Sequence, residues 1–453
     1  MMRKIKRLMF ALLSAVGMMM PGILLMTKTG GFRAILSLTV SFLFLLYVNI
    51  APPTGNAGDL HVDTKRLIQL RRGSALILYA GLTFLPCALC FFYGFRRMSD
   101  WTGGKILLAV LSVLCWLCGE GILLLNGCLR LMATSVQMGV RYRLLLLLCW
   151  WIPGVNLLLF YKLYRLAEQE YETEREKEEL NTVRKESECC HTRYPLLMVH
   201  GVFFRDFRFL NYWGRISKEL MKNGAVIYYG NQQSAASVAS CGEELAERIR
   251  EIVRETGCGK VNIIAHSKGG LDARYAVSKC GAADYTASLT TINTPHRGCF
   301  FADYLLEKAP DGLRRFLAAR YNGTLRRLGD STPDFMSAVE DLTAKACLMR
   351  NGSLPDCASV YYRSVATSMK KAKSGRFPLN MSYYLVKHFD GENDGLVSVD
   401  SALWGDVYAI LRPRGNRGIS HGDMIDLNRE NIPEFDVREF YVNLVKDLKE
   451  KGF

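Results

Sequence analysis

Acidic residues are scarce in the first third of this chain of 453 residues. Residues 1–165 contain four acids against 18 Lys and Arg side chains, whereas residues 166–453 contain 39 acidic and 40 basic side chains. The formal net charge of +15 therefore comes from the first third. Because the surplus is confined to one apolar part of the chain, it does not favour a polyanionic ligand, and no nucleic-acid partner is expected.

Charge is also sparse overall, since charged residues make up 22% of the chain and apolar residues 49%. Disordered chains have the opposite balance, so folded domains are expected. Five long apolar stretches fall at about 8–26, 34–51, 74–95, 106–128 and 144–164. Each has about 18 residues or more, roughly enough for a helix to cross a hydrocarbon core of ~30 Å. We therefore predict an all-α membrane domain over residues 1–165, with about five transmembrane helices and no cleaved signal peptide.

Basic residues in the short loops indicate how these stretches are threaded. If the N-terminus is cytoplasmic, the loops on that side contain eleven Lys and Arg side chains and the opposite loops contain five. Because short basic loops stay in the cytoplasm, five crossings place the rest of the chain outside it. We thus expect a multi-pass membrane protein whose C-terminal part is extracytoplasmic. Within the membrane, Glu120 is either a functional acid or one that faces neighbouring helices.

Residues 166–190 contain no Gly or Pro and have mixed charge, which predicts an exposed helical linker with i,i+4 ion pairs. Beyond it, over residues 191–453, the pattern changes. Short apolar runs at 196–199, 225–229, 261–264 and 288–292 alternate with amphipathic stretches at 212–222, 241–256 and 269–280. This alternation predicts an α/β domain in which helices cover both faces of a mostly parallel sheet. In such sheets ligands bind beyond the carboxyl ends of the strands.

The third apolar run leads into Ala265-His266-Ser267-Lys268-Gly269. A strand, then a serine between small residues, then a helix is the pattern of a nucleophile elbow. The turn is so tight that the residues two before and two after the serine must be small. Ala265 replaces the usual first glycine but keeps the side chain small.

A second loop follows the first strand, at His200-Gly201-Val202. Its backbone can face the nucleophile, so we predict that the amides of Val202 and Lys268 form an oxyanion hole. The alternative is an ordinary turn after a strand.

A serine nucleophile needs a general base and an acid that orients the base. In this fold the chain order is Ser, acid, His. His421 follows every plausible acid and is predicted to be the base, while His296 is expected to be structural and His388 precedes the acids. Asp394 is the preferred acid, because it directly precedes Gly395-Leu396-Val397 and follows a strand-like stretch at 382–387, and Asp390 is the alternative.

These residues resemble a known family, the bacterial true lipases typified by the secreted pseudomonad enzymes. The matching segments are Tyr194–Gly201, Tyr212–Ile216, Lys260–Gly270, Asn293–Gly298, Asn393–Val397 and Ser420–Asp423, in the family's order. The resemblance implies an α/β-hydrolase fold, hydrolysis of carboxylic esters such as triacylglycerol, and a triad of Ser267, Asp394 and His421. It does not extend to residues 1–165.

Two features depart from the family. Its members often hold a structural calcium ion, and Asp423 stands where one ligand is expected, but a second carboxylate is not evident. One acid is weak support for an ion that takes six to eight oxygens. The family's disulfide is missing one partner, because Asp400 stands where a cysteine is expected. Cys347 and Cys357 pair only if the compartment is oxidising.

Between residues 299 and 355 the sequence predicts helices inserted after a core strand, as a lid over an acyl pocket or as a packed cap. We therefore predict a membrane-embedded serine hydrolase that cleaves lipid esters through an acyl-enzyme and requires no cofactor for catalysis. A phospholipase, thioesterase or lipid acyltransferase with the same triad is the alternative. A membrane sensor or transporter with a non-catalytic hydrolase-like domain is a more distant one.

Overall fold

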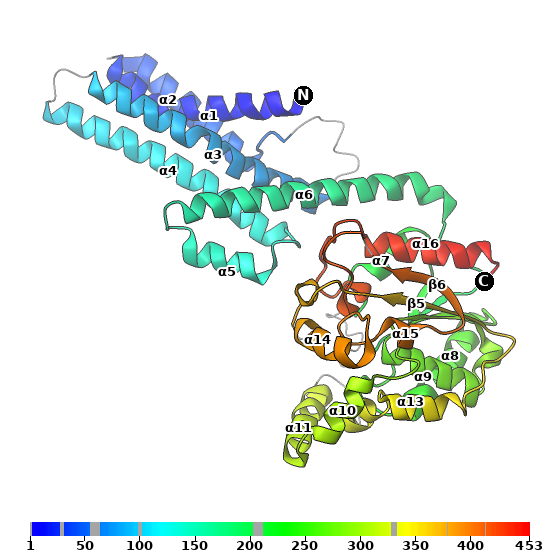
Figure 1. Ribbon diagram of the computed structural model, residues 1–453. Helices are drawn as coiled ribbons and strands as arrows, with labels where there is room; N and C mark the ends of the chain where they lie inside the picture. The colour runs from blue at the N-terminus through cyan, green and yellow to red at the C-terminus, as the bar shows by residue number, and fades with distance from the viewer. Residues whose placement is uncertain are drawn as a thin grey trace. The chain divides into compact units, whose positions relative to one another are not determined.

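A computed structural model describes residues 2–27, 31–54, 64–97, 102–202, 212–327, 333–377, 379–412 and 414–453 (Figure 1). The chain divides into two compact units, Met1–Val183 and Arg184–Phe453, which we call the N-terminal unit and the C-terminal unit.

Four helices of the N-terminal unit have the composition of membrane spans. They are α1 (Met2–Met26), α2 (Gly31–Ile50), α3 (Lys65–Arg96) and α4 (Gly103–Thr134). Within the described residues, these four are the helices long and apolar enough to cross a membrane. Many outward side chains are apolar, such as Phe32, which is 77% exposed. The unit is therefore compatible with membrane insertion.

The fifth predicted span does not form one helix, so the described residues contain four helices of spanning length and composition where the sequence suggested about five. Its residues are divided between α5 (Gly139–Cys149) and α6 (Val155–Arg184). The turn between them contains Pro153 and Gly154, and Gly154 has φ +80°. Proline cannot supply an amide to a helix, and positive φ ends one. The extracytoplasmic expectation rested on an odd number of crossings, whereas four helices of spanning length would give an even number.

Part of α6 is also less exposed than its charged sequence suggests. Glu170 and Tyr171 are each 1% exposed, although an i,i+4 ion pair joins Arg175 to Glu179 at 2.8 Å as expected. Glu120 faces a neighbouring helix, because its Oε1 accepts hydrogen bonds from Thr83 Oγ1 at 2.7 Å and Trp116 Nε1 at 3.2 Å.

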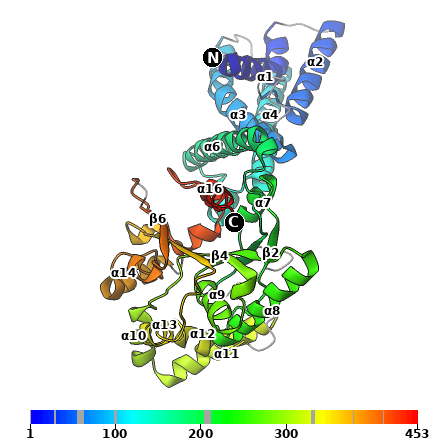
Figure 2. The same ribbon diagram turned by 90° about the vertical axis from the view of Figure 1, so that its right-hand side faces the viewer.

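The C-terminal unit contains a six-stranded sheet in the order β2-β1-β3-β4-β5-β6, and every neighbouring pair is parallel (Figure 2). The strands are β1 (Leu196–Val199), β2 (Ile227–Tyr229), β3 (Val261–His266), β4 (Thr286–Ile292), β5 (Tyr361–Thr367) and β6 (Asp406–Leu411). Strands β1, β3 and β4 are buried throughout, as expected of a parallel sheet covered on both faces.

Helices cover the two faces of the sheet with separate apolar cores. On one face lie α7 (Ile216–Lys222) and α16 (Val437–Glu450), whose core includes Trp213 and Tyr441. On the other lie α8 (Val238–Thr256) and α9 (Lys268–Lys279), whose core includes Leu245 and Val277 (Figures 1 and 2). The α/β architecture predicted from the sequence is confirmed.

Two local predictions differ from the structure. Residues 382–387, read as strand-like, belong to α14 (Leu379–Asp390), where Leu379, Tyr383 and Val386 are buried at helical spacing. Strand β5 was missed because the buried Arg363 interrupts its apolar pattern; the guanidinium bonds Asp447 at 2.6 Å and the Leu444 carbonyl at 2.9 Å.

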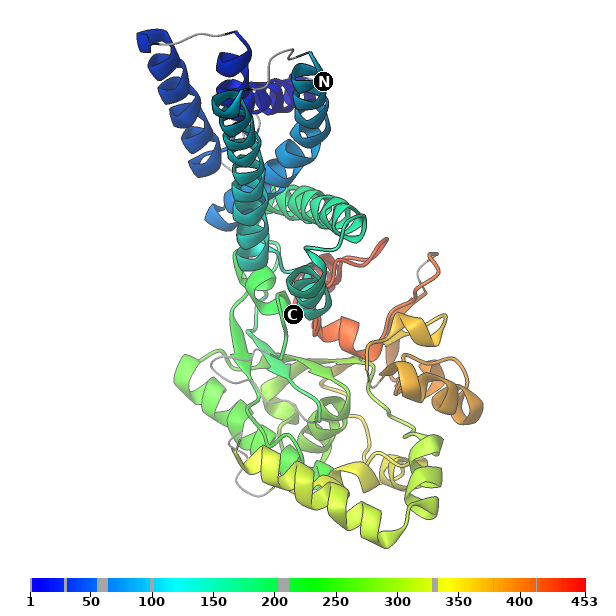
Figure 3. The same cartoon turned by 90° about the vertical axis from the view of Figure 1, so that its left-hand side faces the viewer.

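Four helices fill the interval between β4 and β5 (Figure 3). They are α10 (Phe300–Lys308), α11 (Asp311–Arg327), α12 (Phe335–Glu340) and α13 (Ala344–Asn351). The short remaining elements of the unit are η2 (Lys185–Ser187), η3 (Ala283–Tyr285), η4 (Ala372–Ser374), α15 (Val399–Ala402) and η5 (His421–Ile425).

Candidate active site

Ser267 lies at the sharp turn between β3 and α9. Its backbone has φ 57° and ψ −134°, outside the ordinary regions for a residue with a side chain. The strained turn is held by the Ser267 amide, which donates to the Ile292 carbonyl at the end of β4 at 2.9 Å. Such strain at a strand–helix junction is typical of a nucleophile elbow, in which the hydroxyl projects beyond the sheet.

The small residues around Ser267 are required by close backbone contacts. A Cβ on Gly269 would lie 2.3 Å from the His200 carbonyl oxygen, and a Cβ on Gly201 would lie 2.8 Å from the Ser267 Cβ. Ala265 is fully buried. The loop after β1 therefore packs directly against the elbow, which is why glycine is needed on both sides of the contact.

His421 and Asp394 form a direct pair. The His421 Nδ1 lies 2.7 Å from Asp394 Oδ2, and the His421 amide donates to the Asp394 carbonyl at 2.9 Å. The other carboxylate oxygen, Oδ1, accepts from the amides of Leu396 at 2.9 Å and Val397 at 2.7 Å. Asp394 is completely buried, so its orientation is fixed by these bonds.

The His421 ring packs against the residue that precedes the serine. The ring centroids of His266 and His421 are 4.4 Å apart, and the Tyr212 hydroxyl lies 2.7 Å from His266 Nδ1. Burial lowers the pKa of His266 well below its usual value, and the neighbouring His421 lowers it further. His266 is thus a neutral residue packed between Tyr212 and the His421 ring.

The two predicted oxyanion donors belong to the two segments that meet at the elbow. Lys268 is the first residue of α9, where amides have no partner within the helix. Its side chain is buried and donates to Asp272 Oδ1 at 2.7 Å. Val202 follows Gly201 in the loop after β1, and His200 in that loop lies 3.0 Å from the Gln232 carbonyl.

Asp423 does not have the surroundings of a calcium ligand. Its Oδ2 accepts from the Ser420 amide and hydroxyl, both at 2.8 Å, and from Arg417 Nη1 at 2.7 Å. Its Oδ1 accepts from Arg417 Nη2 at 3.1 Å. A guanidinium therefore occupies the side of the carboxylate that a cation would use, and the described residues include no cluster of three or more metal-ligating side chains.

The alternative residues have other contacts. Asp390 is not a solvated acid, because its oxygens accept from the amides of Phe300 at 2.9 Å and Phe301 at 3.2 Å at the start of α10. Burial raises the pKa of Asp390. His296 is buried beside Thr291 Oγ1 at 3.0 Å and stacks on Trp404, and burial lowers its pKa well below the usual value. His388 is exposed on α14.

All fourteen cysteines are free thiols, including Cys347 and Cys357. Burial raises the pKa of Cys347 to about 11, which makes its thiol unreactive at neutral pH. Asp400 lies in α15, at the position where the family's cysteine was expected.

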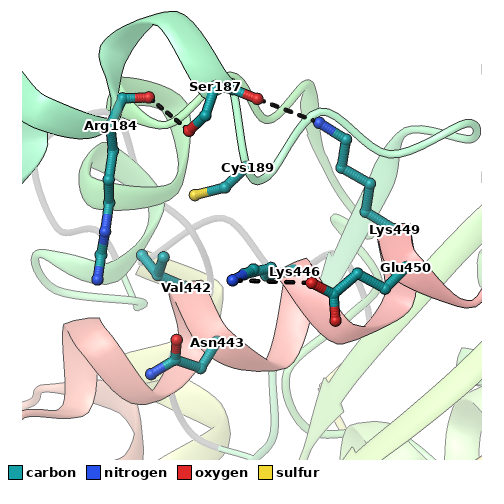
Figure 4. A pocket seen from close by; sticks show the side chains of 8 residues that line it. All are labelled: Arg184, Ser187, Cys189, Val442, Asn443, Lys446, Lys449 and Glu450. Carbon is teal, nitrogen blue, oxygen red and sulfur yellow. Dashed lines mark hydrogen bonds and ion pairs between the residues drawn. The ribbon is translucent and has the colours of Figure 1, made fainter.

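A hollow of about 420 Å³ lies between η2 and α16 (Figure 4). None of the predicted catalytic residues lines it. Its basic side chains have partners: Arg184 bonds Glu439 at 2.5 Å, and Lys449 Nζ donates to the Glu188 carbonyl at 2.8 Å. The hollow is therefore not part of the triad region.

Two residues that bind predicted site residues, Asp272 and Arg417, were not predicted from the sequence. Asp272 pairs with Lys268, and the i,i+4 spacing on α9 was the available signal. Arg417 binds Asp423, and nothing in the sequence distinguishes it from other surface arginines.

A parallel sheet, a strained elbow serine and a buried Asp–His pair in this chain order define an α/β-hydrolase. Residues 196–306 match the DUF676 family of serine esterases. The chain is 35% identical over 288 residues to a triacylglycerol lipase of Vibrio cholerae, covering 58% of this chain and 89% of that protein. The chain therefore belongs to the triacylglycerol lipase family.

Other similarities cover less. A triacylglycerol lipase of Pseudarthrobacter phenanthrenivorans is 37% identical over 177 residues, covering 36% of this chain and 54% of that protein. The chain thus spans about half the length of that relative and of the enzyme of Burkholderia plantarii. A crystal structure of Staphylococcus hyicus lipase superposes with a TM-score of 0.46 and 17% identity, covering 57% of this chain and 97% of that chain.

Proposed function

We propose that the chain is a membrane-anchored serine hydrolase that cleaves the carboxylic ester bonds of lipids. The observation that carries the proposal is the 2.7 Å contact between His421 Nδ1 and buried Asp394, beside an elbow serine with positive φ. Family membership supports ester hydrolysis, and triacylglycerol is the substrate class that the names of the relatives suggest.

In the proposed reaction, His421 Nε2 takes the proton of the Ser267 hydroxyl as its oxygen attacks the ester carbonyl carbon. The Asp394 carboxylate holds the imidazole in the tautomer that leaves Nε2 free, and it stabilises the imidazolium that forms. The amides of Val202 and Lys268 would donate to the developing oxyanion. His421 then returns the proton to the leaving alcohol, so that the carbonyl carbon stays bonded to Ser267 as an acyl-enzyme.

The second half-reaction restores the serine. His421 takes a proton from water, the hydroxide oxygen attacks the acyl carbon, and the bond to Ser267 breaks as the serine oxygen regains the proton. The products are the alcohol and the fatty acid. A lipid acyltransferase would use the same acyl-enzyme with an acceptor alcohol in place of water, and a phospholipase or thioesterase would differ only in the leaving group.

The four apolar helices support a multi-pass anchor, which would keep the hydrolase at the surface where lipid esters are found. The described residues do not provide a calcium site at Asp423, so we propose that Arg417 fills the structural role that the ion has in related lipases. Catalysis as written needs no metal.

A fluorophosphonate probe tests the proposal directly, because it modifies only an activated serine. Membranes containing the full chain should be labelled, and Ser267→Ala should abolish labelling. Ser353→Ala, which removes an exposed hydroxyl bonded only within its own turn, is the matched control and should label like the wild type. An unlabelled wild-type protein would refute the enzyme proposal. Rates on nitrophenyl esters of increasing chain length and on phospholipids then separate lipase from the alternatives.

A further inference from the structure

The segment from α5 to the middle of α6 begins and ends at the same place in the N-terminal unit. Ser135, just after α4, donates through Oγ to Glu170 Oε2 on α6 at 2.6 Å. The amides of Val136 and Gln137 donate to the same carboxylate at 3.0 and 3.2 Å. Because residues 135 and 170 are in contact, the chain between them makes no net crossing of a membrane.

The lengths of the two helices agree with this. Helix α5 has 11 residues, or about 16 Å, which is roughly half of a ~30 Å hydrocarbon core. The apolar part of α6 ends at Leu166, because Glu168 and Glu170 follow. Leu146 of α5 packs with Leu159 and Leu163 of α6 in one apolar cluster. The two helices therefore form a packed hairpin too short to cross.

The same part of α6 contacts the ends of three other helices. Arg7 near the start of α1 forms two bonds to the Glu168 carboxylate, at 2.9 and 3.1 Å. Arg66 at the start of α3 bonds Glu170 Oε1 at 2.6 Å and the Thr134 carbonyl at the end of α4 at 3.0 Å. Figure 1 shows α6 running across the ends of α3 and α4. The start of α1, the start of α3 and the end of α4 thus share one face.

Large apolar side chains of the hairpin are exposed. They include Leu148 at 66%, Trp151 at 65%, Leu157 at 66% and Leu158 at 66%. No acid occurs between Glu120 and Glu168, while Arg141, Arg143, Lys162 and Arg165 are basic. Tryptophan at the tip of an apolar, basic segment that continues from membrane-spanning helices is typical of contact with the headgroup region of an anionic leaflet.

We propose that residues 139–166 form an interfacial hairpin in one leaflet, and that the C-terminal unit and the N-terminus lie on the same, cytoplasmic side of the membrane. Residues 168–190 are too charged to cross, so the C-terminal unit stays on the face where Glu168 and Glu170 lie. The basic residues identify that face: of the 18 Lys and Arg in residues 1–165, thirteen belong to segments on this face, with Lys162 and Arg165 of the hairpin included, and five to segments on the other. With one crossing fewer, the proposal places the C-terminal unit on the side opposite to the one expected from the sequence.

Reporter fusions to the full chain in a bacterial host test the sidedness. Green fluorescent protein placed after Phe453 should fluoresce, and alkaline phosphatase, which needs export, should be inactive there. The matched control places each reporter in the connection between α3 and α4, where the result should invert. Active phosphatase after Phe453 would overturn the proposal. Neither reporter depends on ester hydrolysis, so failure of the proposed function leaves this test unaffected.

Brominated lipids test the hairpin. In nanodiscs of anionic lipid brominated on the acyl chain, bromine should quench the fluorescence of Trp150 and Trp151. The double variant Trp150→Phe/Trp151→Phe identifies that component, because it lacks the fluorescence of these two tryptophans. The fluorescence of Trp404, a tryptophan of the C-terminal unit bonded to Asp356, should not be quenched. The variant Trp404→Phe identifies its contribution in the same way. Because phenylalanine keeps the side chains aromatic, folding should be retained, and circular dichroism checks it. Equal quenching of the two components, or none for Trp150 and Trp151, would contradict an interfacial hairpin.

Discussion

Buried carboxylates organise both units of the protein, but their donors differ. In the N-terminal unit, Glu168 and Glu170 are bonded by the guanidinium groups of Arg7 and Arg66. In the C-terminal unit, Asp394 accepts from two neutral backbone amides and faces His421. An arginine neutralises a carboxylate, whereas amides orient it and leave its charge in place.

This difference matches the roles that we propose, structural for the glutamates and catalytic for Asp394. The glutamates join helix ends, and their charge is cancelled where it is buried. In the proposed reaction, Asp394 would stabilise the imidazolium of His421, with which it is in direct contact. Asp423, bonded by Arg417, belongs with the glutamates even though it lies two residues from His421.

The largest expected effect is that of Asp394→Asn. The amide oxygen can still accept from Leu396 and Val397, but its NH2 group would face His421 Nδ1 and favour the wrong tautomer. We expect kcat on a nitrophenyl ester to fall by about 10⁴-fold while the unfolding temperature changes little. Activity within tenfold of wild type would show that Asp394 is structural and would favour Asp390 as the acid.

The converse substitution, Glu170→Ala, should affect folding and leave the chemistry intact. It would leave the Ser135 hydroxyl without its acceptor and Arg66 with only the longer carboxylate contact, to Glu174 at 3.5 Å, at a cost of about 2 kcal/mol to the N-terminal unit. Denaturant titration of the full chain in detergent micelles, followed by circular dichroism, measures this. Glu172→Ala on the exposed side of α6 is the control. The labelling of each folded molecule by fluorophosphonate should match wild type, and a loss of labelling without unfolding would break the comparison.

The two units also differ in how much of their structure could be predicted from sequence. Ser267, Asp394 and His421 were each identified from local motifs, because a tight turn or a chain order restricts which residues are possible. The break within the fifth apolar run was not predicted, because hydropathy averaged along the run hides Pro153 and Gly154. Arg66 and its partner on α6 are far apart in the sequence, and no motif links Arg417 to Asp423. Only the folded chain therefore reveals these contacts.

The next largest effect is expected from acidification, which should lower the stability of the C-terminal unit. His266 and His296 are buried and neutral in the folded C-terminal unit, since burial lowers the pKa of each well below 6.5. The unfolded chain binds two more protons below pH 6.5, so stability is lost as the pH falls, by at most about 2.7 kcal/mol per pH unit. Asp272 opposes this, because burial raises its pKa to about 6 and the folded state gains a proton there.

We therefore expect a net loss of about 2 kcal/mol in the C-terminal unit between pH 7 and pH 5.5. Thermal unfolding of the full chain at stepped pH measures the slope. His388→Gln, which removes an exposed histidine, is the control and should leave the slope unchanged, whereas His296→Gln should reduce it. A slope of opposite sign would mean that the buried histidines are charged.

The smallest expected effects concern Asp423. Arg417→Lys keeps the charge but replaces a two-pronged contact with a single ammonium, so we expect a loss of about 1 kcal/mol in stability. Chelation with EDTA should change neither the unfolding temperature nor kcat/KM, because the guanidinium already occupies the carboxylate. A drop in unfolding temperature with EDTA, restored by calcium but not by magnesium, would show that an ion binds here after all. Asp423 would then resemble the metal-binding acid of related lipases, and its difference from Asp394 would lie in the cation it holds.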